Sequence, residues 1–187
     1  MDEPAAAANP RVRTAIEQLH KLAAADISAT SPGKRATVRH TEGRFEVRLR
    51  PEGFQQLDPE ILAREVAHAF AGAMRGCEAA ERQLMGDFRP AERPDPPGPV
   101  RERRRELMRR ERSGIAVTAE SPNRMASGTW RGDTGLRLRI TAANESHREQ
   151  LAGELSIVVN RLTELYRTEL KRIMRETKRQ VPAEVRT

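Results

Sequence analysis

The residues with the clearest chemical potential are arginines gathered in one short segment. Between positions 101 and 112 the sequence RERRRELMRRER places seven arginines among three glutamates. Five of these arginines recur at steps of three and four residues, which aligns them along one stripe of a helix. They are Arg101, Arg104, Arg105, Arg109 and Arg112. Because a guanidinium presents a planar fork of donors that matches phosphate oxygens, the stripe predicts contact with an anionic partner.

The same segment has an alternative interpretation as an ordinary solvated helix. Glu102, Glu106 and Glu111 stand three or four residues from arginines, so they could pair with them along the helix surface. Seven arginines against three glutamates leave positive charge in either case.

A second set of arginines alternates with apolar residues, as in a strand with one buried face. In RFEVRLR at 44–50 and LRLRI at 136–140 the arginines occupy the polar face. They are Arg44, Arg48 and Arg50 in the first segment, and Arg137 and Arg139 in the second. The face of an antiparallel sheet that meets solvent is normally charged, so this set could serve solubility alone. We include Arg137 and Arg139 in the predicted binding surface.

Catalytic and metal-binding patterns are missing from the sequence. The four histidines, at 20, 40, 68 and 147, are isolated, and no H-x-x-x-H or C-x-x-C spacing occurs. Cys77, the single cysteine, falls on the apolar stripe of a predicted helix, which favours an inert buried thiol over a nucleophile. The sequence therefore predicts a protein that is not an enzyme, with no catalytic residue, cofactor or metal.

The elements that must position these arginines form two similar series. The first consists of a predicted helix from Asn9–Pro10, strands at 27–31, 36–40 and 44–50, and a helix from Asp58–Pro59. The second consists of a helix over 100–112, strands in 115–122, 126–131 and 136–141, and a helix capped by Asn144. The expected organisation is a flexible start (1–9), a first unit (10–85), a proline-rich linker (86–99), a second unit (100–178) and a flexible end (179–187).

The series predict an α+β fold of two tandem α-β-β-β-α repeats, each a three-stranded antiparallel sheet with flanking helices. Each unit has a small core, and its long helix carries more apolar positions than one sheet can cover. We therefore expect the two repeats to pack together as a pseudo-dimer.

Charge and composition narrow the class of protein. Residues 1–90 hold 13 basic and 13 acidic side chains, so the net charge of +7 lies entirely in residues 91–187. A mean hydropathy of −0.73, without a long apolar run, predicts a soluble chain with no membrane partner. The start MDEPAAAANP lacks the pattern of a secretory signal, and the lone cysteine fits a reducing compartment. We expect a cytoplasmic protein.

Both halves resemble the YbaB/EbfC family of small bacterial nucleoid-associated proteins. In the first half the resemblance rests on ISATSPGKRATVRHTEGRFEVRLRPEGFQQLDPEILAREVAHAFAGAM, with its strand leading into an LDPEIL helix start. In the second it rests on VTAESP at 117–122 and GDTGLRLRI at 132–140, although TAANESHREQ replaces the LDPE start. The resemblance covers most of residues 10–178. It implies an α-β-β-β-α subunit that pairs into a dimer, and binding to double-stranded DNA with little sequence preference.

Two functions follow as hypotheses. The first is a nucleoid-associated protein that neutralises DNA phosphates with its arginines; loss of charge at Arg104, Arg105 and Arg109 should then matter more than loss at Arg44 and Arg48. The second is an interaction or scaffold protein, because members of the family also accompany specialised secretion loci in high-GC Gram-positive bacteria. In that case the long amphipathic helices would bind a homodimer mate or another protein, without DNA.

Overall fold

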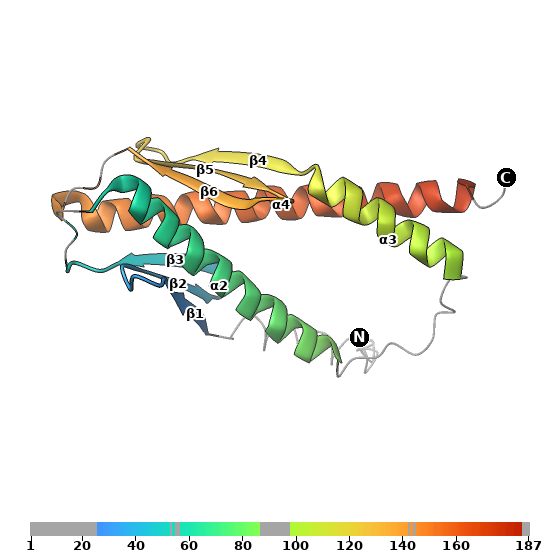
Figure 1. The fold of residues 1–187 in the computed structure, drawn as a ribbon, viewed down its shortest axis with the longest axis horizontal. Coiled ribbons are helices and arrows are strands. Elements are labelled where there is room, and N and C mark those ends of the chain that lie inside the picture. The colour runs from blue at the N-terminus through green and yellow to red at the C-terminus, as the bar shows by residue number, and fades with distance from the viewer. Residues whose placement is uncertain are drawn as a thin grey trace, which may run out of the picture.

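The computed structural model describes residues 26–86 except 53, 55 and 56, and residues 98–184 except 142 and 144. The helix predicted from Asn9, most of the proline-rich linker and the predicted cap Asn144 lie outside the described residues. What is described is an α+β structure with two three-stranded antiparallel sheets and three α-helices (Figure 1).

The first sheet has the strand order β1-β2-β3, built from Ile27–Thr30, Ala36–Thr41 and Arg44–Leu49. Its third strand alternates between exposed and buried positions, which confirms the predicted one-sided face. The hairpin between β2 and β3 turns on Glu42 and Gly43, whose φ angles of 51° and 78° are those of the turn that matches the twist of paired strands.

Helix α2 covers Pro59–Gly86 and begins where the sequence predicts. The Asp58 carboxylate accepts a hydrogen bond from the backbone N–H of Glu60 at 2.7 Å, satisfying one of the free donors of the first turn. On its predicted apolar stripe, Leu62, Val66 and Phe70 are buried.

The second half repeats the order of elements. Helix α3 covers Gly98–Ser113, and the second sheet has the order β4-β5-β6, from Ala116–Glu120, Ala126–Arg131 and Gly135–Ile140. These bounds agree with the predicted strands to within about two residues.

The last helix, α4, starts later and ends later than predicted. A single 3₁₀ turn at Glu145–His147 precedes it, and α4 then runs over Arg148–Glu184. The helix passes the predicted boundary at 178, because Lys178, Arg179 and Gln180 are good helix formers, and it continues through Pro182 to Glu184.

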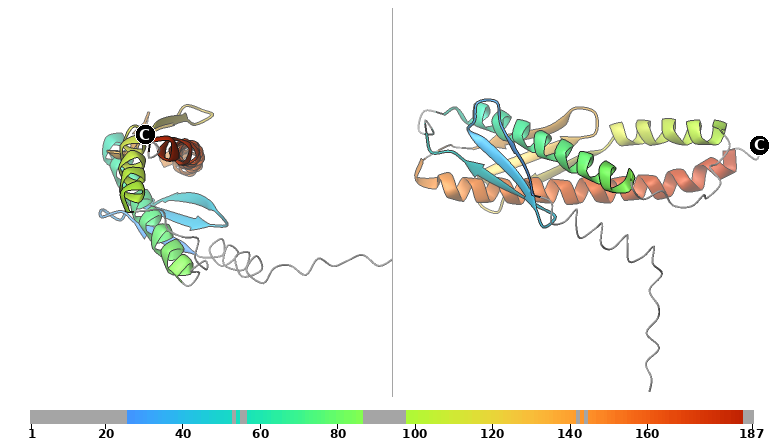
Figure 2. Two further views of the ribbon diagram at one scale, coloured as in Figure 1. Left: turned by 90° about the vertical axis from the view of Figure 1, so that its right-hand side faces the viewer. Right: turned by 90° about the horizontal axis from the view of Figure 1, so that it is seen from below.

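The two sheets share one continuous core because each long helix contacts both of them. Helix α2 packs on β1 and β2 of its own sheet and on β6 of the other, while α4 packs on β4 and β5 and on β3 of the first sheet. Figure 2 shows the sheets on either side of α4 when the molecule is viewed along its long axis.

A row of aromatic rings runs through this core. Phe70 of α2 contacts Phe45 of β3, with ring centroids 4.9 Å apart, and Trp130 of β5, at 5.4 Å. Trp130 in turn stacks on Tyr166 of α4 at 4.4 Å. The side chain of Phe70 therefore joins the two sheets.

The turn between the first two strands is fixed by the same hydrogen bonds in both sheets. Ser31 and Ser121 are ninety residues apart. Each hydroxyl accepts a hydrogen bond from the backbone N–H of the alanine five positions later, at 3.1 and 3.0 Å respectively. The third residue after each serine, Lys34 and Arg124, has a positive φ of 58° and 56°. In each case a carboxylate of a long helix also accepts a hydrogen bond from a backbone N–H of the turn. Glu65 of α2 accepts from Gly33 at 2.9 Å, and Glu154 of α4 accepts from Asn123 at 3.1 Å.

The two carboxylates differ in burial, which yields a prediction. Glu154 is only 6% exposed and also accepts from the Asn123 side chain at 2.7 Å. Hydrogen bonds, from the Ser121 side chain first and then from Asn123, hold the pKa of Glu154 below its usual value. We expect Glu154→Gln to lower the free energy of unfolding by about 1–3 kcal/mol, since an amide cannot accept both bonds. The matched change Glu65→Gln, at the more exposed turn, should cost less in the same urea titration; an equal cost would contradict this account.

His40 gives a second prediction, on pH. Both ring nitrogens of His40 are buried without a hydrogen-bond partner in the described structure, and its ring lies 4.7 Å from that of Phe45. Burial first, and then the positive charge of Arg167, lower the pKa of His40 below its ordinary value of 6.5. The unfolded chain therefore takes up a proton before the folded one does. Stability should be complete above pH 6.5 and should fall as the pH drops below it. In His40→Leu, denaturant midpoints between pH 7 and 5 should change less than in the wild type.

No helix in the described part of the chain combines the length and the apolar character needed to cross a membrane.

Candidate nucleic-acid interface

Two helices extend beyond the sheets and form the most strongly charged part of the molecule. Helix α3 lies beside the C-terminal part of α4 and runs in the opposite direction, so that the pair projects from the body (Figure 1). We call this feature the arm and define it as residues 98–113 and 166–184. Its core is narrow: Tyr166 and Ile173 are buried together with Ile115, which follows α3, and Met108 and Leu170 pack against them. The outer surfaces of both helices are therefore open to a partner.

The structure places four of the five predicted helical arginines together. Arg101, Arg105, Arg109 and Arg112 are exposed, and at about 100° per residue they share one flank of α3. Arg104 is half-buried, like its neighbours Leu107 and Met108 on the side that meets α4. The predicted stripe thus divides into an exposed flank and one arginine at the helix contact.

Arg112 is oriented by the base of the arm. Its Nε donates to the Tyr166 hydroxyl at 3.3 Å, and this hydrogen bond raises the pKa of Arg112. Tyr166 is itself stacked on Trp130. Trp130 therefore packs between Phe70 and Tyr166.

The arm also contains cations that the sequence prediction missed. Helix α4 brings six exposed basic side chains beside α3, and they are Arg167, Lys171, Arg172, Arg175, Lys178 and Arg179. Their spacing of one to four residues was visible in the sequence. The apolar stripe of the same segment predicts the helix, but it does not show which cations share a surface with α3.

Some of the arm's charge is paired within the arm. Arg172 contacts Glu169 at 2.8 Å and Glu176 at 3.0 Å, and Arg103 contacts Glu106 at 3.3 Å. These are exposed pairs on one helix surface, which salt and solvent weaken. The alternative interpretation of α3 as an ion-paired helix therefore holds for Arg103, which was outside the predicted stripe.

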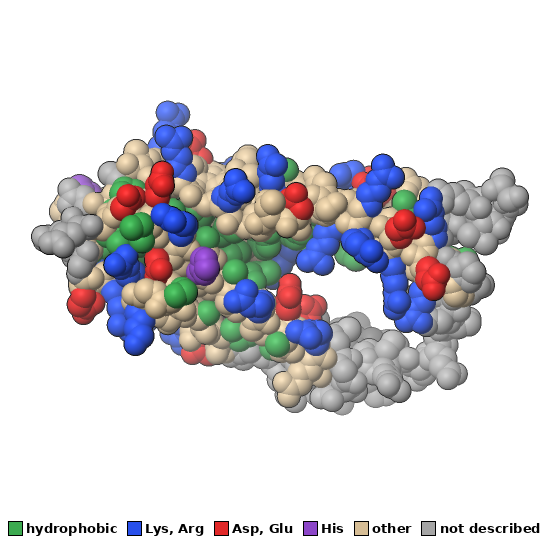
Figure 3. All heavy atoms as spheres, viewed as in Figure 1, with side chains coloured by type: hydrophobic (Ala, Val, Ile, Leu, Met, Phe, Trp, Pro, Cys, Tyr) green, Lys and Arg blue, Asp and Glu red, His purple; other side chains and the backbone are tan. Residues whose placement is uncertain are grey.

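The arm accounts for the whole charge excess of the chain. It holds thirteen of the 34 basic residues and six of the 27 acidic ones, which leaves twenty-one of each elsewhere. Figure 3 shows Lys and Arg side chains along the arm, at the right of the view, with fewer acidic ones among them.

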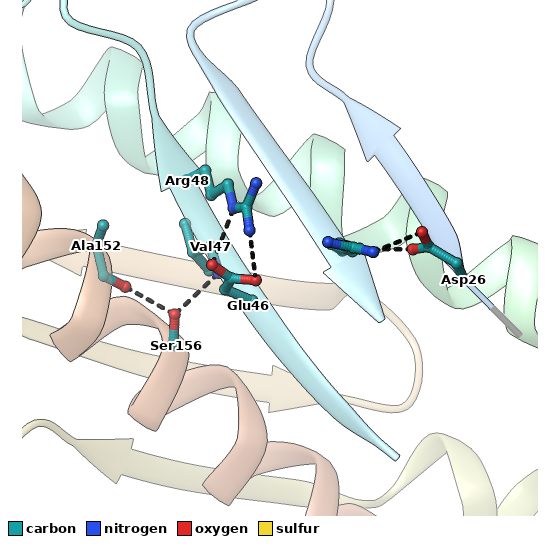
Figure 4. Close-up of polar contacts among 7 residues, drawn as sticks. Asp26, Glu46, Val47, Arg48, Ala152 and Ser156 are labelled. Atoms are coloured by element: carbon teal, nitrogen blue, oxygen red, sulfur yellow. Dashed lines mark hydrogen bonds and ion pairs between the residues drawn. The ribbon is translucent and has the colours of Figure 1, made fainter. Parts of the chain in front are cut away.

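Two arginines of the first sheet are each bound by a carboxylate. Arg48 forms two hydrogen bonds with Glu46, at 2.9 and 3.1 Å, and Arg39 forms two with Asp26, at 2.6 and 2.7 Å (Figure 4). The Arg48 guanidinium, through its hydrogen bond, holds the pKa of Glu46 below its usual value. Each of these arginines thus has a carboxylate as its partner on the same sheet face.

Arg137 and Arg139 are not brought into the arm. They are exposed on β6, which packs against α2 in the body, and together with Arg64 they line a hollow of about 720 Å³. Two of the seven predicted site residues therefore lie apart from the other five.

Comparisons with protein-family models, with curated proteins and with solved structures find no match to this chain.

Proposed function

We propose that this chain is a binding protein for double-stranded DNA, with little sequence preference, and that the arm makes the contacts. The observation that carries the proposal is the concentration of the entire +7 charge on two exposed, adjacent helices. Each DNA phosphate neutralised by Arg or Lys releases condensed counterions, which drives association without reading bases. This mechanism needs neither a catalytic group nor a cofactor.

We also propose that the two halves form a pseudo-dimer of YbaB/EbfC type. Three observations support it: the order of elements, the serine-centred turns ninety residues apart, and the exchange of helix contacts between the sheets. In such an arrangement one chain replaces a pair of identical subunits. A bacterial nucleoid-associated role, in the cytoplasm, follows from the resemblance.

The two halves would then have different tasks. The first half, neutral overall, contributes a sheet whose arginines are partly paired and a helix that completes the core. The second half contributes both helices of the arm. Duplication would thus have freed one copy to gain charge while the other maintained packing.

A salt titration tests the proposal. Fluorescence anisotropy of a labelled 30-base-pair duplex should show binding that weakens steeply between 50 and 200 mM KCl, by about a thousandfold if some six phosphates are neutralised. A second duplex of unrelated sequence should bind with the same affinity within about threefold. Absence of binding at 50 mM, or an affinity insensitive to salt, would refute the proposal.

A further inference from the structure

Next to the arm, and sharing Arg167 and Lys171 with it, the exposed side of α4 carries a second surface of distinct chemistry. Two hollows flank the helix, one of about 970 Å³ toward the first sheet and one of about 700 Å³ toward the second. Both are lined by Arg161, so they meet on the helix. The end-on view of Figure 2 shows the two sheets extending on either side of α4. We call the combined hollow the trough.

The floor of the trough is apolar on both sides of a cation. Ile157 and Leu165 are 45% and 38% exposed, and they stand one helical turn before and after Arg161. Ile157 lines the hollow toward the first sheet and Leu165 the hollow toward the second, so the two exposed aliphatic side chains offer a partner protein apolar contacts on either side of Arg161.

The walls of the trough carry an excess of positive charge. Five basic side chains line it: Arg44, Arg124, Arg161, Arg167 and Lys171. Among the described residues none of these five forms an ion pair, whereas Glu46, one of the three glutamates of the lining, is bound to Arg48. The trough therefore complements an acidic surface.

We propose that the trough docks an amphipathic acidic helix from a partner protein. The complementary pattern is an acidic residue with an apolar residue one turn before and one turn after it, to contact Arg161, Ile157 and Leu165 respectively. DNA fits this floor poorly, because aliphatic side chains offer phosphate nothing. A second copy of this chain also fits poorly, because its exposed helices carry the +7 excess and would bring like charges together. The trough does not require that the arm bind DNA.

The test uses a synthetic 18-residue peptide with a Leu-x₃-Glu-x₃-Leu core, glutamates on its polar face and a fluorescein label. The full chain should bind it, and Ile157→Gln with Leu165→Gln should weaken binding by about thirtyfold, since two aliphatic contacts are lost. Gln preserves helix propensity, so α4 should remain folded. The control is Ile61→Gln, which alters an aliphatic residue of the same 38% exposure on α2, outside the trough, and should change binding less than twofold.

A charge exchange locates the peptide on the helix. Arg161→Glu should abolish binding of the Leu-x₃-Glu-x₃-Leu peptide, and a peptide with arginine in place of the core glutamate should recover at least part of it. The arm variant Arg105→Gln with Arg109→Gln should bind the original peptide as the wild type does.

Four results would overturn the proposal. The first is absence of peptide binding to the wild type, and the second is equal weakening of peptide binding by the arm and trough variants. The third is that the Ile157→Gln, Leu165→Gln variant loses duplex DNA binding as much as it loses peptide binding. The fourth is a concentration-dependent dimer, seen by light scattering, that this variant abolishes. The third result would assign the trough to DNA and the fourth to a second copy of the chain.

Discussion

Removing charge from the arm should weaken DNA binding far more than removing the same charge from the first sheet. Arg105→Gln with Arg109→Gln deletes two exposed guanidinium groups from α3, and Arg175→Gln with Lys178→Gln deletes two cations from α4. If each cation neutralises one phosphate, either pair should reduce the slope of log affinity against log salt by about 1.8. We expect each pair to lower affinity about tenfold at 100 mM KCl, and the four changes together about a hundredfold.

The matched control is Arg44→Gln with Arg48→Gln, which lowers the net charge of the chain by the same two units. Arg48 is already paired with Glu46, and both arginines lie on β3 of the first sheet and not on the two helices of the arm. Anisotropy titrations of this variant should remain within about threefold of the wild type. Equal losses in the arm and control variants would mean that the overall charge attracts DNA, and would refute the placement of the site on the arm. Arg104 is left out of the design because it is half-buried.

The local elements of this fold could be predicted because single residues specify them. Asp58–Pro59 marks the start of α2, and alternation in RFEVRL fixes the buried face of β3. Each signal acts within a few residues, and the structure confirms each of them.

Contacts between distant segments could not be predicted in the same way. The edge of β3 shows why: the backbone N–H groups of Phe45 and Val47 donate to Asn160 and Ser156 of α4, both at 2.9 Å (Figure 4 shows the bond to Ser156). Nothing in the sequence near residue 45 indicates that a polar face of a helix more than a hundred residues later covers this strand. The alternative, an open edge, would leave unpaired donors exposed to other strands.

The candidate site was half predictable for the same reason. The arginines of α3 are consecutive in sequence, so composition alone found them. Lys171, Arg175 and Lys178 belong to the site because α4 runs alongside α3, and Arg137 and Arg139 do not because β6 lies beside α2. Charge clusters in sequence thus identify cations, while the packing of helices decides which of them share a surface.

Truncating Phe70 should produce the largest loss of stability. Phe70 is 2% exposed, and its ring lies between Phe45 of the first sheet and Trp130 of the second. Phe70→Ala removes buried surface and opens a cavity at the contact between the sheets, so we expect a loss of about 3–5 kcal/mol in the free energy of unfolding. For a chain of this length, that corresponds to a fall of about 10 °C in Tm.

Trp130 reports on this site because it is the only tryptophan in the chain. In the wild type, unfolding followed by Trp130 fluorescence and by far-ultraviolet circular dichroism should give one coincident transition, because a single core spans both sheets. Phe54→Ala is the control: it also removes a phenylalanine that is 2% exposed and should cost a similar amount, but it should leave the native emission of Trp130 unchanged. Phe70→Ala should change that emission, since it removes a ring in contact with Trp130. Two separate transitions in the wild type would show that the sheets unfold independently, and the exchanged helix contacts would then contribute little to holding the two halves together.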